Sequence, residues 1–167
     1  MHVIVFRKMK WTRARSGMRA ALACTVLVGS IAFAPPAQAS SGVEVIDAHM
    51  LTELEQHALT ANAREQAFLY ADLADKLSVL AGKQLADGEV DEAEATLERM
   101  EDCTAKMESN FQQSKSLKKT ELLLHMTNRR LSDMVRAAGM DAKPHVQSAL
   151  KRLNAAQTSL LAIIFAK

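Results

Sequence analysis

The sequence has few residues that interrupt helices, with 3 prolines and 6 glycines among 167 residues. Residues 91–138 contain neither, and they lie between Gly88 and Gly139. This stretch predicts a long helix, because glycine and proline are the residues least favourable in a helix interior. The chain also lacks the alternating pattern of a strand. The sequence therefore predicts an all-α fold: an elongated helical hairpin or bundle of four helices, built on a long central helix at about 91–138.

Cysteine is scarce too, with 2 in the chain, and only Cys103 lies beyond the leader that residues 1–39 are predicted to form. One thiol cannot form an intramolecular disulfide, so no disulfide framework is expected. Several catalytic signatures are absent, among them Gly-x-Ser-x-Gly, His-Glu-x-x-His, the phosphate loop and the dinucleotide fingerprint. We therefore expect a protein that is not an enzyme, with no catalytic residue and no cofactor.

Residues 1–39 have the organisation of an export signal. A basic segment without acidic residues precedes a largely apolar run at 20–34, and Ala37-Gln38-Ala39 is a suitable cleavage site. The run is short for a transmembrane helix. We predict cleavage near Ala39/Ser40, which leaves one all-helical domain at 40–167 in the periplasm or outside the cell. An uncleaved N-terminal anchor is the alternative, and the length of the leader leaves open whether translation starts at Met1 or Met9.

Charge is divided sharply along the predicted domain. All 19 acidic residues lie beyond residue 39, but 6 of the 21 basic residues precede it, so residues 40–167 carry a net charge of about −4. This balance argues against a nucleic-acid partner. Residues 40–110 hold 16 acidic and 5 basic residues, whereas 111–167 hold 10 basic and 3 acidic ones. Either the halves neutralise each other, within the bundle or between protomers, or the basic half forms a face for an anionic envelope surface. That face would consist of Lys115, Lys118, Lys119, Arg129, Arg130 and Arg136.

The apolar stripe of the long stretch changes register near its middle. Its first part places Leu97, Met100 and Met107 on one face, whereas its second part places Leu117, Leu124 and Leu131 seven residues apart, as in a coiled-coil seam. The slip falls at the polar segment 112–116, so the helix either changes packing partners there or bends there.

Helices are also expected on both sides of the long stretch. A first helix is predicted at about 45–60, a second at 63–86 that ends at Asp87-Gly88, and a last one capped by Asp141 with Pro144 in its first turn. We expect the second helix to pack on the first half of the long stretch and the last helix to fold back on the second half.

One hairpin resembles a known repeat. The segment Gly88-Glu89-Val90-Asp91-Glu92-Ala93, with Leu97 after it and the small Ala81 before it, is similar to the turn and second-helix start of a tetratricopeptide repeat. The resemblance covers about residues 69–100 and implies an antiparallel helical hairpin. No second copy follows at the ~34-residue period of that family, and its large aromatic positions are missing. A peptide-binding solenoid is therefore not predicted, and the chain as a whole matches no family pattern.

Two sets of residues have the spacing of metal ligands. Glu53/His57 and Glu121/His125 each place a carboxylate and an imidazole on one helix face, and together they would offer four ligands to zinc. Met100, Cys103 and Met107 would offer soft sulfur ligands to Cu(I). The alternatives are exposed helix pairs for the first set and core packing for the second. We favour these alternatives and assign no metal ligand.

The sequence favours a small exported helical protein that acts by binding or scaffolding, through a protein partner or self-association. A periplasmic chaperone-like or copper- or zinc-handling protein is the alternative. Leu51-Thr52 and Gln56 are similar to the Leu-Thr-x-x-Gln motif of small periplasmic stress chaperones. The glutamine lies one residue late and no second copy exists, so we interpret this match as coincidental.

Overall fold

The computed structural model describes residues 46–166, which lie within one compact unit, Gly42–Lys167. Within this range the chain is all-helical, as predicted, with helices α1 (Ala48–Thr60), α2 (Ala63–Asp87), α3 (Val90–Ser109), α4 (Leu117–Ala137) and α5 (Lys143–Phe165). There are five α-helices instead of the four predicted, because the expected long helix is two helices. The predicted leader lies outside the described residues.

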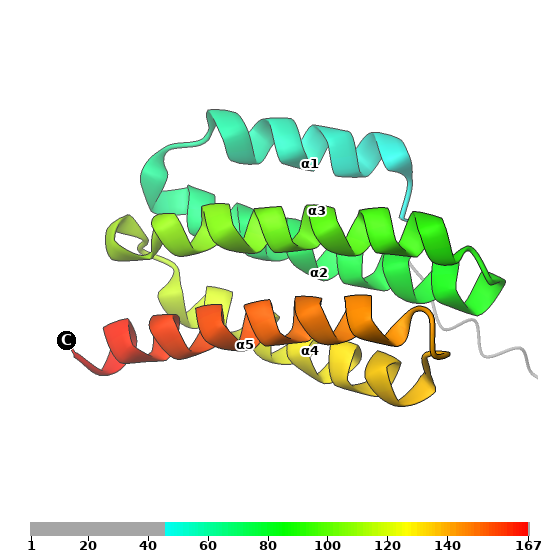
Figure 1. Ribbon diagram of the computed structural model, residues 1–167. Helices are drawn as coiled ribbons and strands as arrows, with labels where there is room; N and C mark the ends of the chain where they lie inside the picture. The colour runs from blue at the N-terminus through cyan, green and yellow to red at the C-terminus, as the bar shows by residue number, and fades with distance from the viewer. Residues whose placement is uncertain (1–45, 167) are drawn as a thin grey trace, which may run out of the picture. The chain divides into compact units, whose positions relative to one another are not determined.

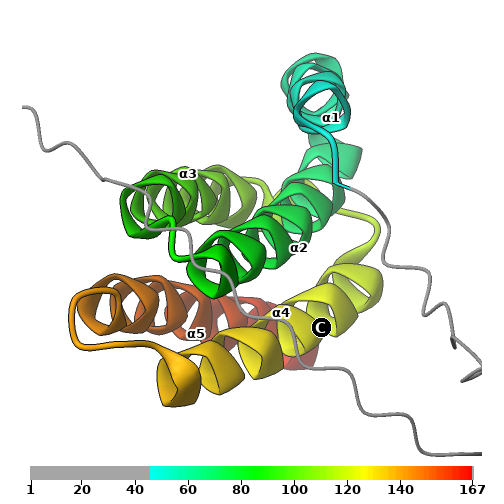
Figure 2. The same ribbon diagram turned by 90° about the vertical axis from the view of Figure 1, so that its right-hand side faces the viewer.

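Two antiparallel hairpins, α2–α3 and α4–α5, stack on each other (Figure 1). α2 contacts α4, and α3 contacts α5, so the four helices occupy the corners of a square in which α3 and α4 are diagonally opposed (Figure 2). α1 packs mainly on α2, and its side chains Leu51 and Ala58 are buried. Both expected pairings are confirmed: the second helix packs on the first half of the long stretch, and the last helix packs on the second half.

Local signals explain where α2 begins and ends. Asn62 caps its start, and the Asn62 side chain accepts a hydrogen bond from the backbone N–H of Arg64. Gly88 ends α2 in the left-handed conformation, with a φ of 83°. Its backbone N–H donates hydrogen bonds to carbonyls of the last turn of the helix. This turn leads directly into α3, as a helical hairpin requires. The prediction for Asp141 was wrong: Ala142 precedes α5, without a side-chain cap, although Pro144 does lie in the first turn.

The long stretch breaks at residues 110–116, where a short 3-10 turn, Phe111–Gln113, and an extended Ser114 reverse the chain. Polar side chains satisfy the backbone there and compete with the helix. Ser109 Oγ and Asn110 Nδ2 donate to the carbonyl of Lys106 at 2.7 and 2.8 Å, and Ser114 Oγ accepts from the N–H of Ser116. Phe111 is 1% exposed and anchors the turn in the core. Of the two alternatives for 112–116, the chain bends there, and the bend is a full reversal, so the long stretch at 91–138 forms two helices.

The core confirms the predicted register slip. Leu97, Met100 and Met107 of α3 are buried, and so are Leu117, Leu124 and Leu131 of α4; all six belong to one hydrophobic core. Residues that a continued first stripe would bury, such as Lys118 and His125, are exposed. The change of register in the apolar stripe thus marks the place where the chain reverses.

Candidate functional site

The sulfur residues of α3 lie in the core. Met100 and Met107 are fully buried, and Cys103 is 4% exposed. Burial raises the pKa of the Cys103 thiol to about 11, with a smaller contribution from the nearby Glu55 carboxylate. Met100, Cys103 and Met107 all belong to the hydrophobic core, and the raised pKa of the thiol favours the interpretation of these residues as core packing.

The two Glu/His pairs are not brought together. Among residues 46–166, no group of three or more His, Cys, Asp or Glu side chains is placed to hold a metal ion. Glu53 pairs with His49, at 3.6 Å, and Glu121 accepts a hydrogen bond from Gln157. The arrangement therefore gives the four residues separate surroundings on α1 and α4.

Part of the charge division is neutralised between the hairpins. Arg130 of α4 donates to Asp75 of α2 at 2.6 Å, and Arg152 of α5 lies 2.9 Å from Glu108 of α3. His145 of α5 lies 3.0 Å from Glu94. Acidic residues of the first half thus meet basic residues of the second half across the contact between the hairpins.

The remaining cations separate into two groups. Arg130 is used in the contact with α2, and Arg136 pairs with Asp133 on its own helix. Lys115, Lys118, Lys119 and the exposed Arg129 have no ion pair in the described part of the chain. Arg64, at the start of α2, is likewise unpaired and was not predicted from the sequence, because only the fold places it near Lys115.

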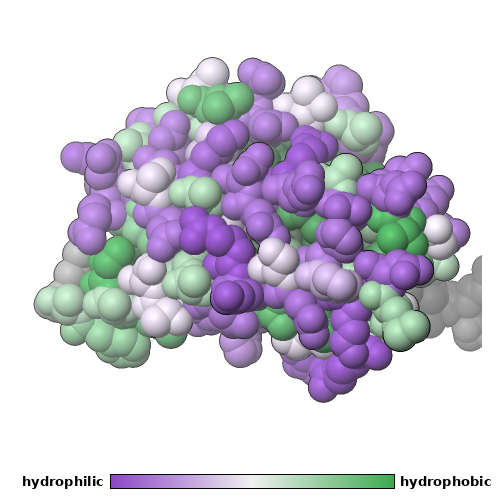
Figure 3. All heavy atoms as spheres, viewed as in Figure 1, coloured by the Kyte–Doolittle hydropathy of each residue, from purple (hydrophilic) through white to green (hydrophobic). Residues whose placement is uncertain are grey.

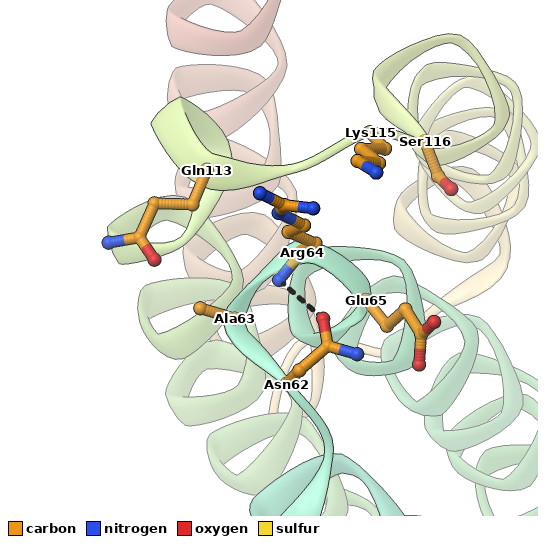
Figure 4. A pocket seen from close by; sticks show the side chains of 7 residues that line it. All are labelled: Asn62, Ala63, Arg64, Glu65, Gln113, Lys115 and Ser116. Atoms are coloured by element: carbon orange, nitrogen blue, oxygen red, sulfur yellow. Dashed lines mark hydrogen bonds between the residues drawn. The ribbon is translucent and has the colours of Figure 1, made fainter.

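Two adjoining hollows at one end of the unit are lined by Arg64, Lys115, Lys118 and Lys119, whereas Arg129 borders neither. The first measures about 640 Å³, and its lining includes Arg64, Gln113 and Lys115. Figure 4 shows Arg64 and Lys115 beside the segment at 110–116 that links α3 to α4, which we call the crossover, with Glu65 turned away from them. The backbone N–H of Lys115 also donates to the Arg64 carbonyl at 3.3 Å, which ties the crossover to α2. The second hollow measures about 780 Å³ and is bounded by Ser114, Lys115, Ser116, Leu117, Lys118, Lys119 and Ile164.

Large apolar side chains are exposed beside these lysines. Leu122 is 58% exposed, one turn after Lys118 on α4, and Phe165 is 83% exposed at the end of α5. Ile164, next to Phe165, borders the second hollow. Figure 3 shows apolar side chains gathered where α5 ends. We call this surface the basic–apolar end; it consists of Arg64, Lys115, Lys118, Lys119, Leu122, Ile164 and Phe165.

The cations of this surface occupy unfavourable places on their helices. Lys118 and Lys119 lie in the first turn of α4, which contains no acidic residue and has no side-chain cap. Arg64 lies in the first turn of α2. The positive end of the helix dipole disfavours cations in a first turn, by ~0.3–1 kcal/mol each. A local rule broken several times at one surface is typical of a functional region.

No helix within the described residues has the length and apolar character that crossing a membrane requires. Comparisons of the chain with protein-family models, with curated proteins and with solved structures found no match.

Proposed function

We propose that this chain is an exported, non-catalytic binding or assembly component that engages its partner through the basic–apolar end. The observation that carries the proposal is the exposure of Leu122 and Phe165 among cations that lack counter-charges. An isolated apolar side chain on a surface is ordinary, but apolar groups bordered by unpaired charge suit recognition of an amphipathic partner.

The surroundings of the titratable groups also favour binding over catalysis. Burial keeps the Cys103 thiol protonated in the core. Each histidine that forms an ion pair does so with a single carboxylate, as His145 does with Glu94.

Site-specific photo-crosslinking in the cells that export the protein tests this proposal. A photoreactive amino acid replaces Leu122 in one variant and the exposed Gln147 of α5 in a matched control. We expect a discrete crosslinked product, to protein or to lipid, from position 122 and not from position 147. Equal, diffuse labelling from both positions, or no product from position 122, contradicts a binding role for this surface.

A further inference from the structure

We infer that the basic–apolar end docks on the surface of an anionic phospholipid bilayer. This inference rests on the proposed binding function and names its partner. The surface offers what such a bilayer requires: cations for the phosphates, and protruding apolar side chains for the boundary between headgroups and acyl chains.

The arrangement of the cations fits phosphate groups. Arg64 and Lys115 border one hollow, and Lys115, Lys118 and Lys119 border the next, so Lys115 is common to both. Each basic side chain close to an anionic membrane strengthens binding about fivefold. Four of them together supply a factor of several hundred, which is enough for reversible attachment but not for permanent insertion.

The exposed apolar side chains fit the bilayer better than they fit a second copy of this chain. The acidic face most complementary to α4 is that of α3, with seven acidic and two basic residues. Among the large apolar side chains that are exposed, none belongs to α3; those of α4 and α5 are Leu122, Met126 and Phe165. A second copy would therefore match the lysines of this end but leave its apolar groups without a partner, whereas a bilayer matches both.

The charges of the rest of the unit would orient it on the membrane. α4 carries five basic and two acidic residues, and it lies diagonally opposite α3. Most acidic residues of α3 lie along the length of the helix, beyond its last turn at the basic–apolar end, so only Glu108 lies in the turn next to the docked end. The field of the bilayer thus favours one orientation of the protein.

Vesicle sedimentation tests the inference, with the exported chain purified after expression with its own leader. The probes are vesicles of phosphatidylcholine alone and of phosphatidylcholine mixed with an equal amount of phosphatidylglycerol. We expect binding to the mixed vesicles alone, and weaker binding as salt rises, because screening shortens the range of the charges. The Lys118→Glu/Lys119→Glu variant should lose binding at least twentyfivefold. Leu122→Ser and Phe165→Ser should each weaken binding at constant charge.

The matched control is Lys143→Glu/Lys151→Glu, which makes the same change in net charge on exposed residues of α5. Lys143 lies in the first turn of α5, so it also shares the helix position of Lys118. We expect the control to retain binding within a few fold. Equal losses in the two double variants, or no binding of the wild-type chain to the mixed vesicles, overturn the lipid assignment.

A second measurement separates the lipid assignment from the binding function on which it rests. If position 122 crosslinks to a discrete protein in cells but the purified chain does not bind anionic vesicles, the surface binds a protein and the lipid assignment is wrong. Sedimentation without vesicles tests for a second copy: a dimer that Leu122→Ser dissociates would likewise replace the bilayer as the partner.

Discussion

The polar contact between the hairpins gives the sharpest test of the fold. Arg130 Nη1 donates to Asp75 Oδ1 at 2.6 Å and to Ser78 Oγ at 2.6 Å, and Thr127 Oγ1 donates to the same carboxylate at 2.8 Å. The Asp75 side chain is 17% exposed and that of Arg130 is 31% exposed. Arg130→Met removes the cation and leaves a largely buried carboxylate with only the Thr127 hydroxyl among these donors.

The size of the effect follows from the burial of the two groups. Breaking a fully buried ion pair costs about 3–5 kcal/mol, mostly because the surviving charge has no partner. Arg130 is nearly a third exposed, so water reaches this pair and we expect a loss of ~2 kcal/mol in the free energy of unfolding. Removing both charges, as in Asp75→Leu/Arg130→Met, should recover most of that loss, since no unpaired ion remains.

Urea unfolding of the wild type, both single variants and the double variant measures the coupling between the two residues. Arg136→Met is the control, because Arg136 pairs with Asp133 on the exposed face of the same helix. We expect it to change stability by less than ~0.5 kcal/mol. If Arg130→Met were equally mild, or if the two single losses simply added in the double variant, the contact would not hold the hairpins together as we argue.

Three further predictions concern single positions. The folded-state pKa of Cys103 is raised from 9.0 to about 11, so the free energy of unfolding should fall as pH rises through this window. The decline should reach ~2 kcal/mol relative to Cys103→Ala, and little difference in slope between pH 9 and 11 would contradict it. Phe111→Ala should lower stability by ~3–5 kcal/mol in urea unfolding, because it leaves a cavity beneath the reversal. A loss below ~1 kcal/mol would mean that Phe111 does not anchor the turn. Lys118→Glu should raise the stability of the lipid-free protein by ~0.5–1 kcal/mol, since a negative charge suits the first turn of α4. An unchanged or lower melting temperature would refute this assignment of the dipole.

Helix positions and burial followed closely from the sequence, because apolar periodicity reports which side of a helix is buried. Leu124 and Leu131 were predicted to face the second packing zone, and both are buried. Gly88 was predicted to end α2, and it does so in the left-handed conformation. These signals are local, so they do not depend on how the hairpins stack.

A bend near 112–116 was one of the two alternatives, but the full reversal of the chain at 110–116 was not predicted, because the segment contains neither glycine nor proline. Ser109, Asn110 and Ser114 end the helix by bonding to the backbone, and Phe111 fixes the turn by burial. Such side chains are tolerated within helices elsewhere, so their effect depends on tertiary packing.

The candidate surface could not be predicted from the sequence for a related reason. Arg64 lies some fifty residues before Lys115, and only the reversal of the chain brings them to one hollow.

The reversal also explains how a charge division along the sequence becomes a division in space. Had the long stretch continued as one helix, its acidic and basic halves would lie at opposite ends of a rod. Because the chain reverses at 110–116, the basic hairpin stacks on the acidic one, and charges that face the contact, such as Asp75 and Arg130, pair there. The mostly acidic α3 and the mostly basic α4 lie at diagonal corners. One short polar segment thus sets both the main polar link between the hairpins and the unpaired cations of the basic–apolar end.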